Sequence, residues 1–186
     1  MLITITWKAW SGKSTAAKAL AERLWYEYIS IWSMKRIVAQ QMWISILEFN
    51  ELWERPENQK EFDLKYEEYQ KGLDPKSKIV LESRLWFFCQ PKSFKIFLTV
   101  DEESAAKRIF KDKRSTDNYS SWQEVLKKTK IRDKEDVQRY QNLYWVDYSD
   151  HKNYDLIYDS TDKTIEETVD DIIKSFNNWK QKNQER

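Results

Sequence analysis

Glycine, cysteine and histidine are scarce in this 186-residue chain, which has two glycines, one cysteine and one histidine. Because Cys89 is the only cysteine, an internal disulfide is excluded, and with His151 as the only histidine a zinc site of these residues is disfavoured. The chain also lacks an excess of either charge, because its formal net charge is +1. This balance argues against general binding to nucleic acid or to a membrane surface.

Long apolar runs are missing as well, since none approaches the roughly 20 residues that a membrane span needs. The first residues, MLITIT, form a short β-type run without the basic and apolar regions of a secretory leader. We therefore expect a cytoplasmic protein that has neither a nucleic-acid nor a membrane partner.

Tryptophan is as abundant as glycine is scarce: the chain has ten tryptophans, whereas average usage of about 7% predicts roughly 13 glycines. Trp25, Trp43, Trp53 and Trp145 each follow a helix-like run, where a left-handed glycine usually ends the helix. A large side chain is penalised in that conformation.

We interpret most of these tryptophans as residues standing where glycine belongs. One route to this outcome is a gene in which UGA encodes glycine but was translated as tryptophan. Trp122 and Trp179 lie in helix-like contexts and fit genuine tryptophans. The alternative interpretation is a natural protein that is simply rich in aromatic residues.

Hydrophobic periodicity divides the chain into alternating strands and helices. Strands are expected at 2–6, 26–30, 77–83, 94–100 and 154–160, and helices at 13–24, 33–42, 45–53, 56–72, 101–113, 122–144 and 163–182. Such alternation predicts a three-layer α/β fold, with about five parallel strands and helices on both faces of the sheet. No repeat or long linker divides the chain, so residues 1–186 are expected to form one domain.

The segment TWKAWSGKST (6–15) lies between the first strand and the first helix and ends as a phosphate-binding loop does. With glycine in place of Trp7 and Trp10, its backbone N–H groups could turn toward a phosphate. Lys13 would then reach the β and γ phosphates of ATP, Ser14 would ligate Mg²⁺, and Thr15 would contact the α phosphate.

The expected ATP-binding loop thus comprises Trp7, Lys8, Ala9, Trp10, Ser11, Gly12, Lys13, Ser14 and Thr15. With tryptophan at position 10 the loop is expected to bind ATP poorly, because the indole ring would crowd the anion cavity.

Several arginines follow the predicted strands or share one helix face, and they indicate which reaction the phosphate loop serves. Arg36 follows the second strand and Arg84 the third, while Arg132, Asp136 and Arg139 lie on one face of the 122–144 helix. Guanidinium groups that converge from several elements suit a phosphate acceptor and the charge of a phosphoryl-transfer transition state. The helix residues are equally compatible with a solvated face that carries ion pairs.

These motifs resemble those of the cytidylate kinases, in particular the short archaeal-type form within the nucleoside monophosphate kinase family. The resemblance extends from about residue 2 to about residue 175. It is carried by LITITWKAWSGKST, YISIWSMKR, IVLESRLW, FKIFLTVDEESAAKRI, KIRDKEDVQRYQNLYWVDYSD and YDLIYDST. Several tryptophans in these segments fall where that family usually has glycine.

The resemblance implies a phosphate-loop kinase fold with a helical region for the nucleoside monophosphate at about 32–75 and a short lid at about 111–121. The implied acceptor-binding residues are Arg36, Asp63, Arg84, Asp136 and Arg139, and the implied catalytic residues are Lys13, Arg84, Arg132, Asp136 and Arg139. Arg108 and Arg114 would contact ATP, Lys111 and Lys113 would lie in the lid, and Ser14 and Glu82 would hold Mg²⁺, Glu82 through water.

The implied activity is transfer of the γ-phosphoryl group of ATP, with Mg²⁺, to CMP or dCMP. Two departures bear on the base: Leu85 replaces an aspartate that larger bacterial members use to read cytosine, and Ile31 replaces a serine. UMP and AMP therefore remain alternative acceptors. A kinase or hydrolase for another small molecule is a further alternative, and so is a chain without a nucleotide site if the loop tryptophans are genuine.

Overall fold

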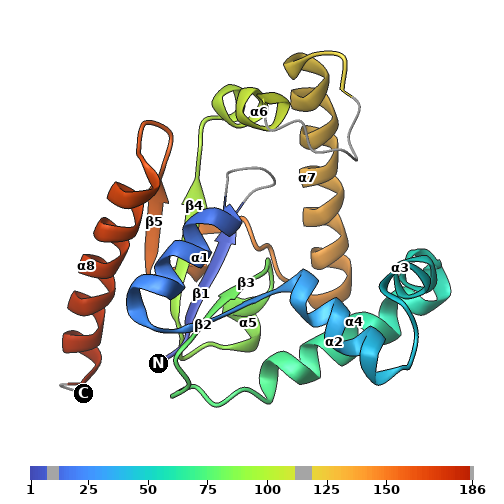
Figure 1. The fold of residues 1–186 in the computed structure, drawn as a ribbon, viewed down its shortest axis with the longest axis horizontal. Coiled ribbons are helices and arrows are strands. Elements are labelled where there is room, and N and C mark those ends of the chain that lie inside the picture. The colour runs from blue at the N-terminus through green and yellow to red at the C-terminus, as the bar shows by residue number, and fades with distance from the viewer. Residues whose placement is uncertain (8–12, 112–118, 185–186) are drawn as a thin grey trace.

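A computed structural model describes residues 1–7, 13–111 and 119–184, and its centre is a parallel sheet (Figure 1). The strands are β1 (Ile3–Trp7), β2 (Glu27–Ser30), β3 (Ile79–Glu82), β4 (Phe94–Thr99) and β5 (Leu156–Asp159). Their order is β2-β3-β1-β4-β5, and every neighbouring pair is parallel. The predicted α/β fold with a five-stranded parallel sheet is confirmed.

Helices connect the strands and cover both faces of the sheet. They are α1 (Lys13–Leu24), α2 (Ile31–Gln41), α3 (Ile46–Glu54), α4 (Pro56–Lys71), α5 (Trp86–Cys89), α6 (Glu102–Lys111), α7 (Trp122–Tyr144) and α8 (Ile165–Gln184), with a 3₁₀ turn at His151–Asn153. The predicted bounds of α1 and α7 are confirmed, whereas α5 and the 3₁₀ turn were missed. Each of these two spans about one turn, which is too short to establish a helical period.

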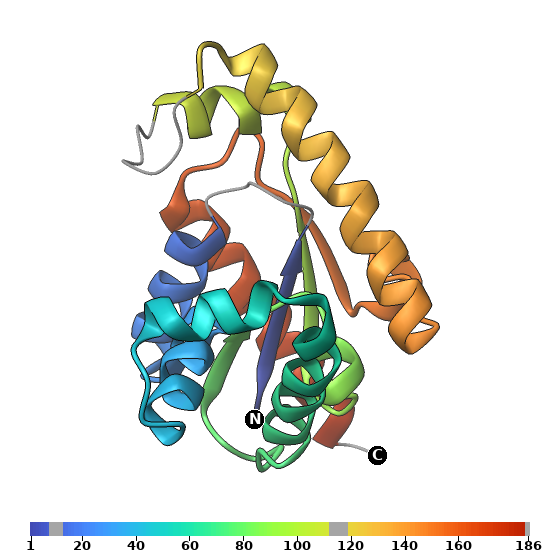
Figure 2. The ribbon, with the colours of Figure 1, turned by 90° about the vertical axis from the view of Figure 1, so that its right-hand side faces the viewer.

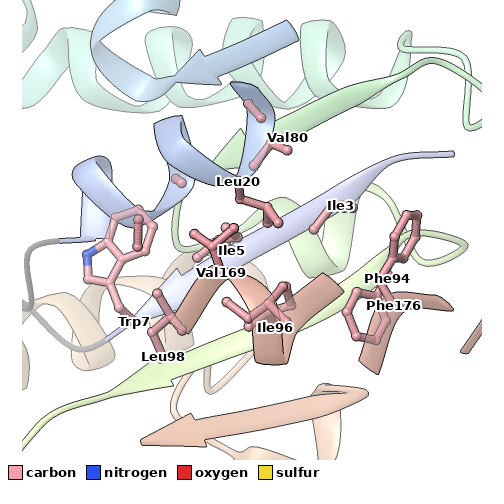
Figure 3. Close-up of a cluster of buried hydrophobic side chains, with 14 residues drawn as sticks. Ile3, Ile5, Trp7, Leu20, Val80, Phe94, Ile96, Leu98, Val169 and Phe176 are labelled. Atoms are coloured by element: carbon pink, nitrogen blue, oxygen red, sulfur yellow. The ribbon is translucent and has the colours of Figure 1, made fainter. Parts of the chain in front are cut away.

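One face of the sheet packs against α1 and α8 through alternating residues of the central strands (Figure 3). Ile3 and Ile5 of β1 point into this core, with Leu20 of α1 and Val169 and Phe176 of α8. The intervening residues of β1 face the opposite side, because successive side chains of a strand alternate. On the α1 side of the sheet, the first turn of α1 reaches the end of β3, where the Ser14 hydroxyl meets Glu82.

The helices α2, α3 and α4 form an arm beside the sheet (Figure 2). Their apolar side chains share one core with residues of β2, β3 and α5. Phe49 of α3 and Phe62 of α4 meet in an edge contact, with ring centroids 4.9 Å apart. A capping box at Ser45 and Glu48 fixes the start of α3. The arm falls within the range expected for the acceptor-binding region, although its assignment to that role stays a prediction.

Three tryptophans end helices in the left-handed conformation. Trp25, Trp43 and Trp145 have φ of 56°, 58° and 57°, and their side chains are 90%, 94% and 91% exposed. They are the positive-φ residues other than glycine in the described part of the chain. The glycine-type helix ends predicted at these positions are therefore confirmed.

The backbone hydrogen bonds at two of these ends are those of a glycine-terminated helix. Trp25 N donates to Glu22 O at 3.2 Å, and Tyr26 N donates to Ala21 O at 2.8 Å. The same pair of bonds recurs at Trp43, whose N–H donates to Gln40 O at 3.1 Å. This paired arrangement is the Schellman motif, in which the left-handed residue is most often glycine.

The other tryptophans follow a different pattern. Trp53 lies in the last turn of α3, which ends one residue later at Glu54, so the expected helix end is confirmed to within one residue. The left-handed conformation expected at Trp53 is wrong, because Trp53 lacks a positive φ and the cap residue Arg55 is extended, with φ of −72°. Trp7 and Trp86 are buried in apolar cores and lack a positive φ. At these two positions the case for glycine therefore depends on sequence motifs and not on the backbone.

Cys89 is buried at the end of α5, and burial raises the pKa of its thiol to about 12. A thiol that stays protonated at neutral pH is a poor nucleophile, so Cys89 acts as a small apolar residue of the core. Among the helices of the described residues, none combines the length and the apolar character needed to cross a bilayer.

Candidate active site

The candidate site lies at the carboxyl ends of the central strands. β1 lies between β3 and β4, and the chain leaves β1 toward β2 on one side, while β4 and β5 extend the sheet on the other. In open parallel sheets, ligands bind at such a reversal of strand order, outside the carboxyl ends of the strands. The first turn of α1 and the end of β3 meet at this point.

On the α1 side, the site contains a hydroxyl and a carboxylate joined by a hydrogen bond. The Ser14 hydroxyl, in the first turn of α1, donates a hydrogen bond of 2.8 Å to Glu82 Oε1 at the end of β3. Glu82 is only 3% exposed, and Tyr28 of β2 donates a hydrogen bond to its other oxygen, Oε2. Burial, followed by the bond to Glu82, raises the pKa of Tyr28, so its hydroxyl stays a donor.

This pair fits a magnesium ion. Mg²⁺ prefers hard oxygen ligands and is usually held by one or two protein groups together with the phosphates of a nucleotide. The Ser14 hydroxyl at the start of α1 and the buried Glu82 carboxylate at the end of β3 are oxygen groups of this kind. Ser14 and Glu82, predicted as the metal-binding residues, are thus brought together, and the metal role itself remains a proposal.

On the other side of β3, Arg84 is held by two aspartates of α7. Arg84 Nη1 lies 2.5 Å from Asp136 Oδ2, and Nη2 lies 3.8 Å from Asp133 Oδ1. The guanidinium also lies 5.5 Å from the ring centroid of Tyr148. Burial alone lowers the pKa of Arg84, but the combined effect of Tyr148 and the two carboxylates raises it. The guanidinium therefore stays charged within a partly buried cluster.

The predicted helix face of α7 divides into an inner and an outer part. Asp136 turns inward to Arg84, whereas Arg132 is largely exposed and lies 4.0 Å from Asp136. Arg139 lies with its guanidinium 5.8 Å from the ring centroid of Tyr140. The structure thus places Arg84 and Asp136 in one cluster, with Arg132 at its rim.

The remaining predicted residues are spread over several elements. Arg108 of α6 donates hydrogen bonds to the backbone carbonyls of Thr161 at 2.6 Å and Ser160 at 3.4 Å, in the loop after β5. Arg36 is exposed on α2, and Asp63 lies in α4. Lys13 and Thr15 lie in the first turn of α1, and Lys111 ends α6. Lys8, Ala9, Trp10, Ser11, Gly12, Lys113 and Arg114 lie outside the described residues.

Sequence reasoning missed Tyr28 and Tyr148, which contact the predicted residues Glu82 and Arg84. Alternation along β2 could have placed Tyr28 on the same face as Ser30, at the end of the strand nearest the loop. No local pattern marks Tyr148 as a neighbour of Arg84, because this contact depends on how α7 and the following loop pack.

Asp136→Asn is expected to lower the free energy of unfolding by about 3 kcal/mol, because it leaves the charge of Arg84 without its closest partner. The side chains of Arg84 and Asp136 are only 14% and 16% exposed. Urea unfolding measures the change. The matched control is Asp170→Asn, whose pair with Arg23 is 2.7 Å long but 55% and 61% exposed, and which should change stability by less than about 1 kcal/mol. Equal effects of the two substitutions would contradict the prediction.

Comparison with known proteins extends over most of the chain. Residues 2–162 match the model of a family described as the cytidylate kinase-like family. The chain is 35% identical over 176 residues to a cytidylate kinase of Halobacterium salinarum, an alignment that covers 93% of this chain and 87% of that protein. It is 33% identical over 174 residues to a cytidylate kinase of Methanosarcina mazei, with 91% and 93% covered.

A further relative is an S-adenosylmethionine-dependent nucleotide dehydratase of Lacinutrix mariniflava, 34% identical over 176 residues. The match covers 94% of this chain, which spans about a third of that relative, since 35% of its length is covered.

Solved structures share the fold at low identity. A shikimate kinase from Bacteroides thetaiotaomicron superposes with a TM-score of 0.63 at 15% identity, over 95% of this chain and 98% of that one. A shikimate kinase from Aquifex aeolicus superposes with a TM-score of 0.54, also at 15% identity, over 96% and 97% of the two chains. The expected phosphate-loop kinase fold is therefore confirmed.

Proposed function

Because this chain belongs to the cytidylate kinase-like family and is a nucleotide kinase by that relationship, we propose that it phosphorylates CMP or dCMP with ATP. The observation that carries the proposal is the pair of groups at the end of β3. Glu82 meets Ser14 of the phosphate loop, and Arg84, two residues later, meets Asp136 of α7. The end of β3 would thus contribute to two sites: a donor side that binds ATP and an acceptor side that binds the nucleoside monophosphate.

The donor side would bind ATP through the loop and the start of α1. The first N–H groups of α1 lack intrahelical partners and suit phosphate, and Lys13 stands at the first position of this helix. Mg²⁺ held by Ser14 and, through water, by Glu82 would neutralise charge on the phosphates. Arg108, which reaches the loop after β5, would border the ATP base together with Thr161.

The acceptor side would bind the monophosphate between β3, α7 and the helical arm. Arg84 and Arg36 would grip its phosphate, since guanidinium groups bind phosphate with two parallel hydrogen bonds. Asp136 of α7 would orient Arg84, and Arg132, 4.0 Å from Asp136, would add positive charge at the rim. Arg139, on the same helix, would contribute a further positive charge toward the acceptor. Asp63 of α4 would contact the nucleoside.

Catalysis would come from positioning and charge neutralisation, without a covalent intermediate. Closure of the lid expected at about 111–121 over the phosphates would exclude water and so suppress hydrolysis of ATP. The whole chain, 1–186, would act as one domain and as a monomer.

A transfer assay with ATP and Mg²⁺ tests the proposal against a panel of acceptors. The panel contains CMP, dCMP, UMP and AMP, with shikimate and gluconate to represent other small-molecule kinases. It is run on the chain as it stands, on Trp10→Gly and on Trp7→Gly/Trp10→Gly. We expect the highest kcat/KM with CMP or dCMP in a glycine variant. A preference for UMP or AMP would correct the base, and phosphorylation of shikimate alone, or of nothing in any variant, would overturn the proposal.

A further inference from the structure

Tyr28 lies on the edge strand β2, yet its hydroxyl reaches the centre of the candidate site. In the β2–β3 ladder, Tyr28 pairs with Val80, and Ser30 pairs with Glu82. All four side chains share one face of the sheet, because paired residues and those two apart point the same way. From this position the Tyr28 side chain reaches toward the carboxyl end of β3, and its hydroxyl donates a hydrogen bond to Glu82 Oε2.

The two oxygens of Glu82 therefore have separate donors. Oε1 accepts the bond from Ser14 at 2.8 Å, and Oε2 accepts the bond from Tyr28. A buried carboxylate requires such partners, and donors on both oxygens fix the rotation of the carboxylate plane. Without the tyrosine hydroxyl, Glu82 would keep one of these bonds and could rotate about its terminal torsion.

The same corner of the molecule connects the donor side to the helical arm. Ser30, two residues after Tyr28, caps α2 by accepting a hydrogen bond of 3.1 Å from Ser33 N. The Tyr28 ring is fixed independently of its hydroxyl, since it packs against the α1 core and lies 5.6 Å from Lys18 Nζ. Removing only the hydroxyl thus leaves the packing of the ring in place.

We propose that Tyr28 is a positioning residue of the phosphoryl-transfer site: its hydroxyl holds the Glu82 carboxylate in the orientation that serves Mg²⁺ and its waters. This inference rests on the proposed function, because it presumes that Ser14 and Glu82 receive the metal of Mg–ATP. Groups that orient metal-binding side chains through hydrogen bonds commonly change metal affinity by 10- to 100-fold when removed.

The test is Tyr28→Phe, made in whichever loop version the transfer assay finds most active. The matched control is Tyr158→Phe. It removes a hydrogen bond of 2.8 Å from a tyrosine hydroxyl to the Asp171 carboxylate, next to β5 at the opposite edge of the sheet. Two readouts are followed as Mg²⁺ is varied: the rise in melting temperature that ATP produces, and the rate of transfer at saturating acceptor. The KM for the acceptor is measured at saturating Mg²⁺.

For Tyr28→Phe we expect the Mg²⁺ concentration at half-maximal effect to rise about 10-fold in both readouts, with the acceptor KM unchanged within twofold. Tyr158→Phe should leave the Mg²⁺ dependence as it is. If Tyr28→Phe matches its parent in Mg²⁺ dependence, whatever its melting temperature, the positioning role is wrong while the proposed function stands. If ATP and Mg²⁺ neither stabilise the parent nor support transfer, both proposals are overturned together.

Discussion

Replacing Trp25, Trp43 and Trp145 together by glycine is expected to raise the free energy of unfolding by about 3 kcal/mol. The left-handed conformation costs a residue with a side chain about 1–2 kcal/mol, and the greater freedom of glycine in the unfolded chain offsets part of this gain. Each site should therefore contribute about 1 kcal/mol. For a chain of this size the melting temperature should rise by roughly 6 to 12 °C.

The exposure of these side chains makes the gain observable. Because each indole is at least 90% exposed, its removal deletes almost no packing that could mask the relief of backbone strain. The hydrogen bonds that end the helices at Trp25 and Trp43 are made by backbone atoms, so glycine retains them. Thermal and urea unfolding of the three single variants and the triple variant would measure each contribution.

Trp179→Gly is the matched control, because it makes the same chemical change at a site with the opposite requirement. Trp179 lies inside α8, with its ring centroid 5.4 Å from that of Phe94 and 6.3 Å from that of Phe176. Loss of this packing and of helix propensity should lower the free energy of unfolding by about 4 kcal/mol. If all four replacements lower stability alike, the tryptophans at the helix ends are genuine structural residues.

The same contrast bears on the codons of the source gene. If the tryptophans at helix ends stand for glycine, UGA is expected at 25, 43 and 145, and UGG at 122 and 179. At 7, 32, 53 and 86 the backbone is not left-handed, and position 10 lies outside the described residues, so the codons themselves decide these five positions. Mass spectrometry of the protein from its source cell provides an independent reading. UGG at all ten tryptophans would overturn the interpretation.

Trp10→Gly, alone or with Trp7→Gly, is expected to raise kcat/KM for ATP by about 100-fold or more. Donors that are aimed at developing charge in an active site are each worth about 10² to 10³ in rate, and the loop supplies several backbone N–H groups. Glycine lets these groups turn toward the phosphates, whereas an indole at position 10 would crowd them. Trp10 itself lies outside the described residues, so this prediction rests on the sequence motif.

Trp7 makes the double variant informative, because its indole is buried in the core between β1, α1 and α8 (Figure 3). Its removal alone should cost about 4 kcal/mol as a cavity, which bound ATP would partly offset. Titration of ATP and Mg²⁺ against the melting temperature separates the two effects. ATP affinity as high in the unchanged chain as in both glycine variants would contradict the role given to the loop glycines.

The sequence alone determined the local elements and the residue types of the site. The bounds of α1 and α7 follow from helix propensity, apolar spacing and cap residues that lie within a few positions of each other. The left-handed ends at Trp25, Trp43 and Trp145 follow in the same way from where each helical pattern stops. The ending of the phosphate loop identified Ser14 because its motif is a fixed local spacing.

Only the tertiary structure decided which of these residues meet. The strand order, with β1 between β3 and β4, brings Glu82 against Ser14, and the path of α7 brings Asp136 against Arg84. Tyr28 and Glu82, whose partnership the sequence did not reveal, are 54 residues apart. Local periodicity cannot predict such pairs. They form only when separate helices and strands bury their apolar faces against one another, which decides which residues become neighbours. The residue types of this site were thus readable in the sequence, and their partners were set by packing.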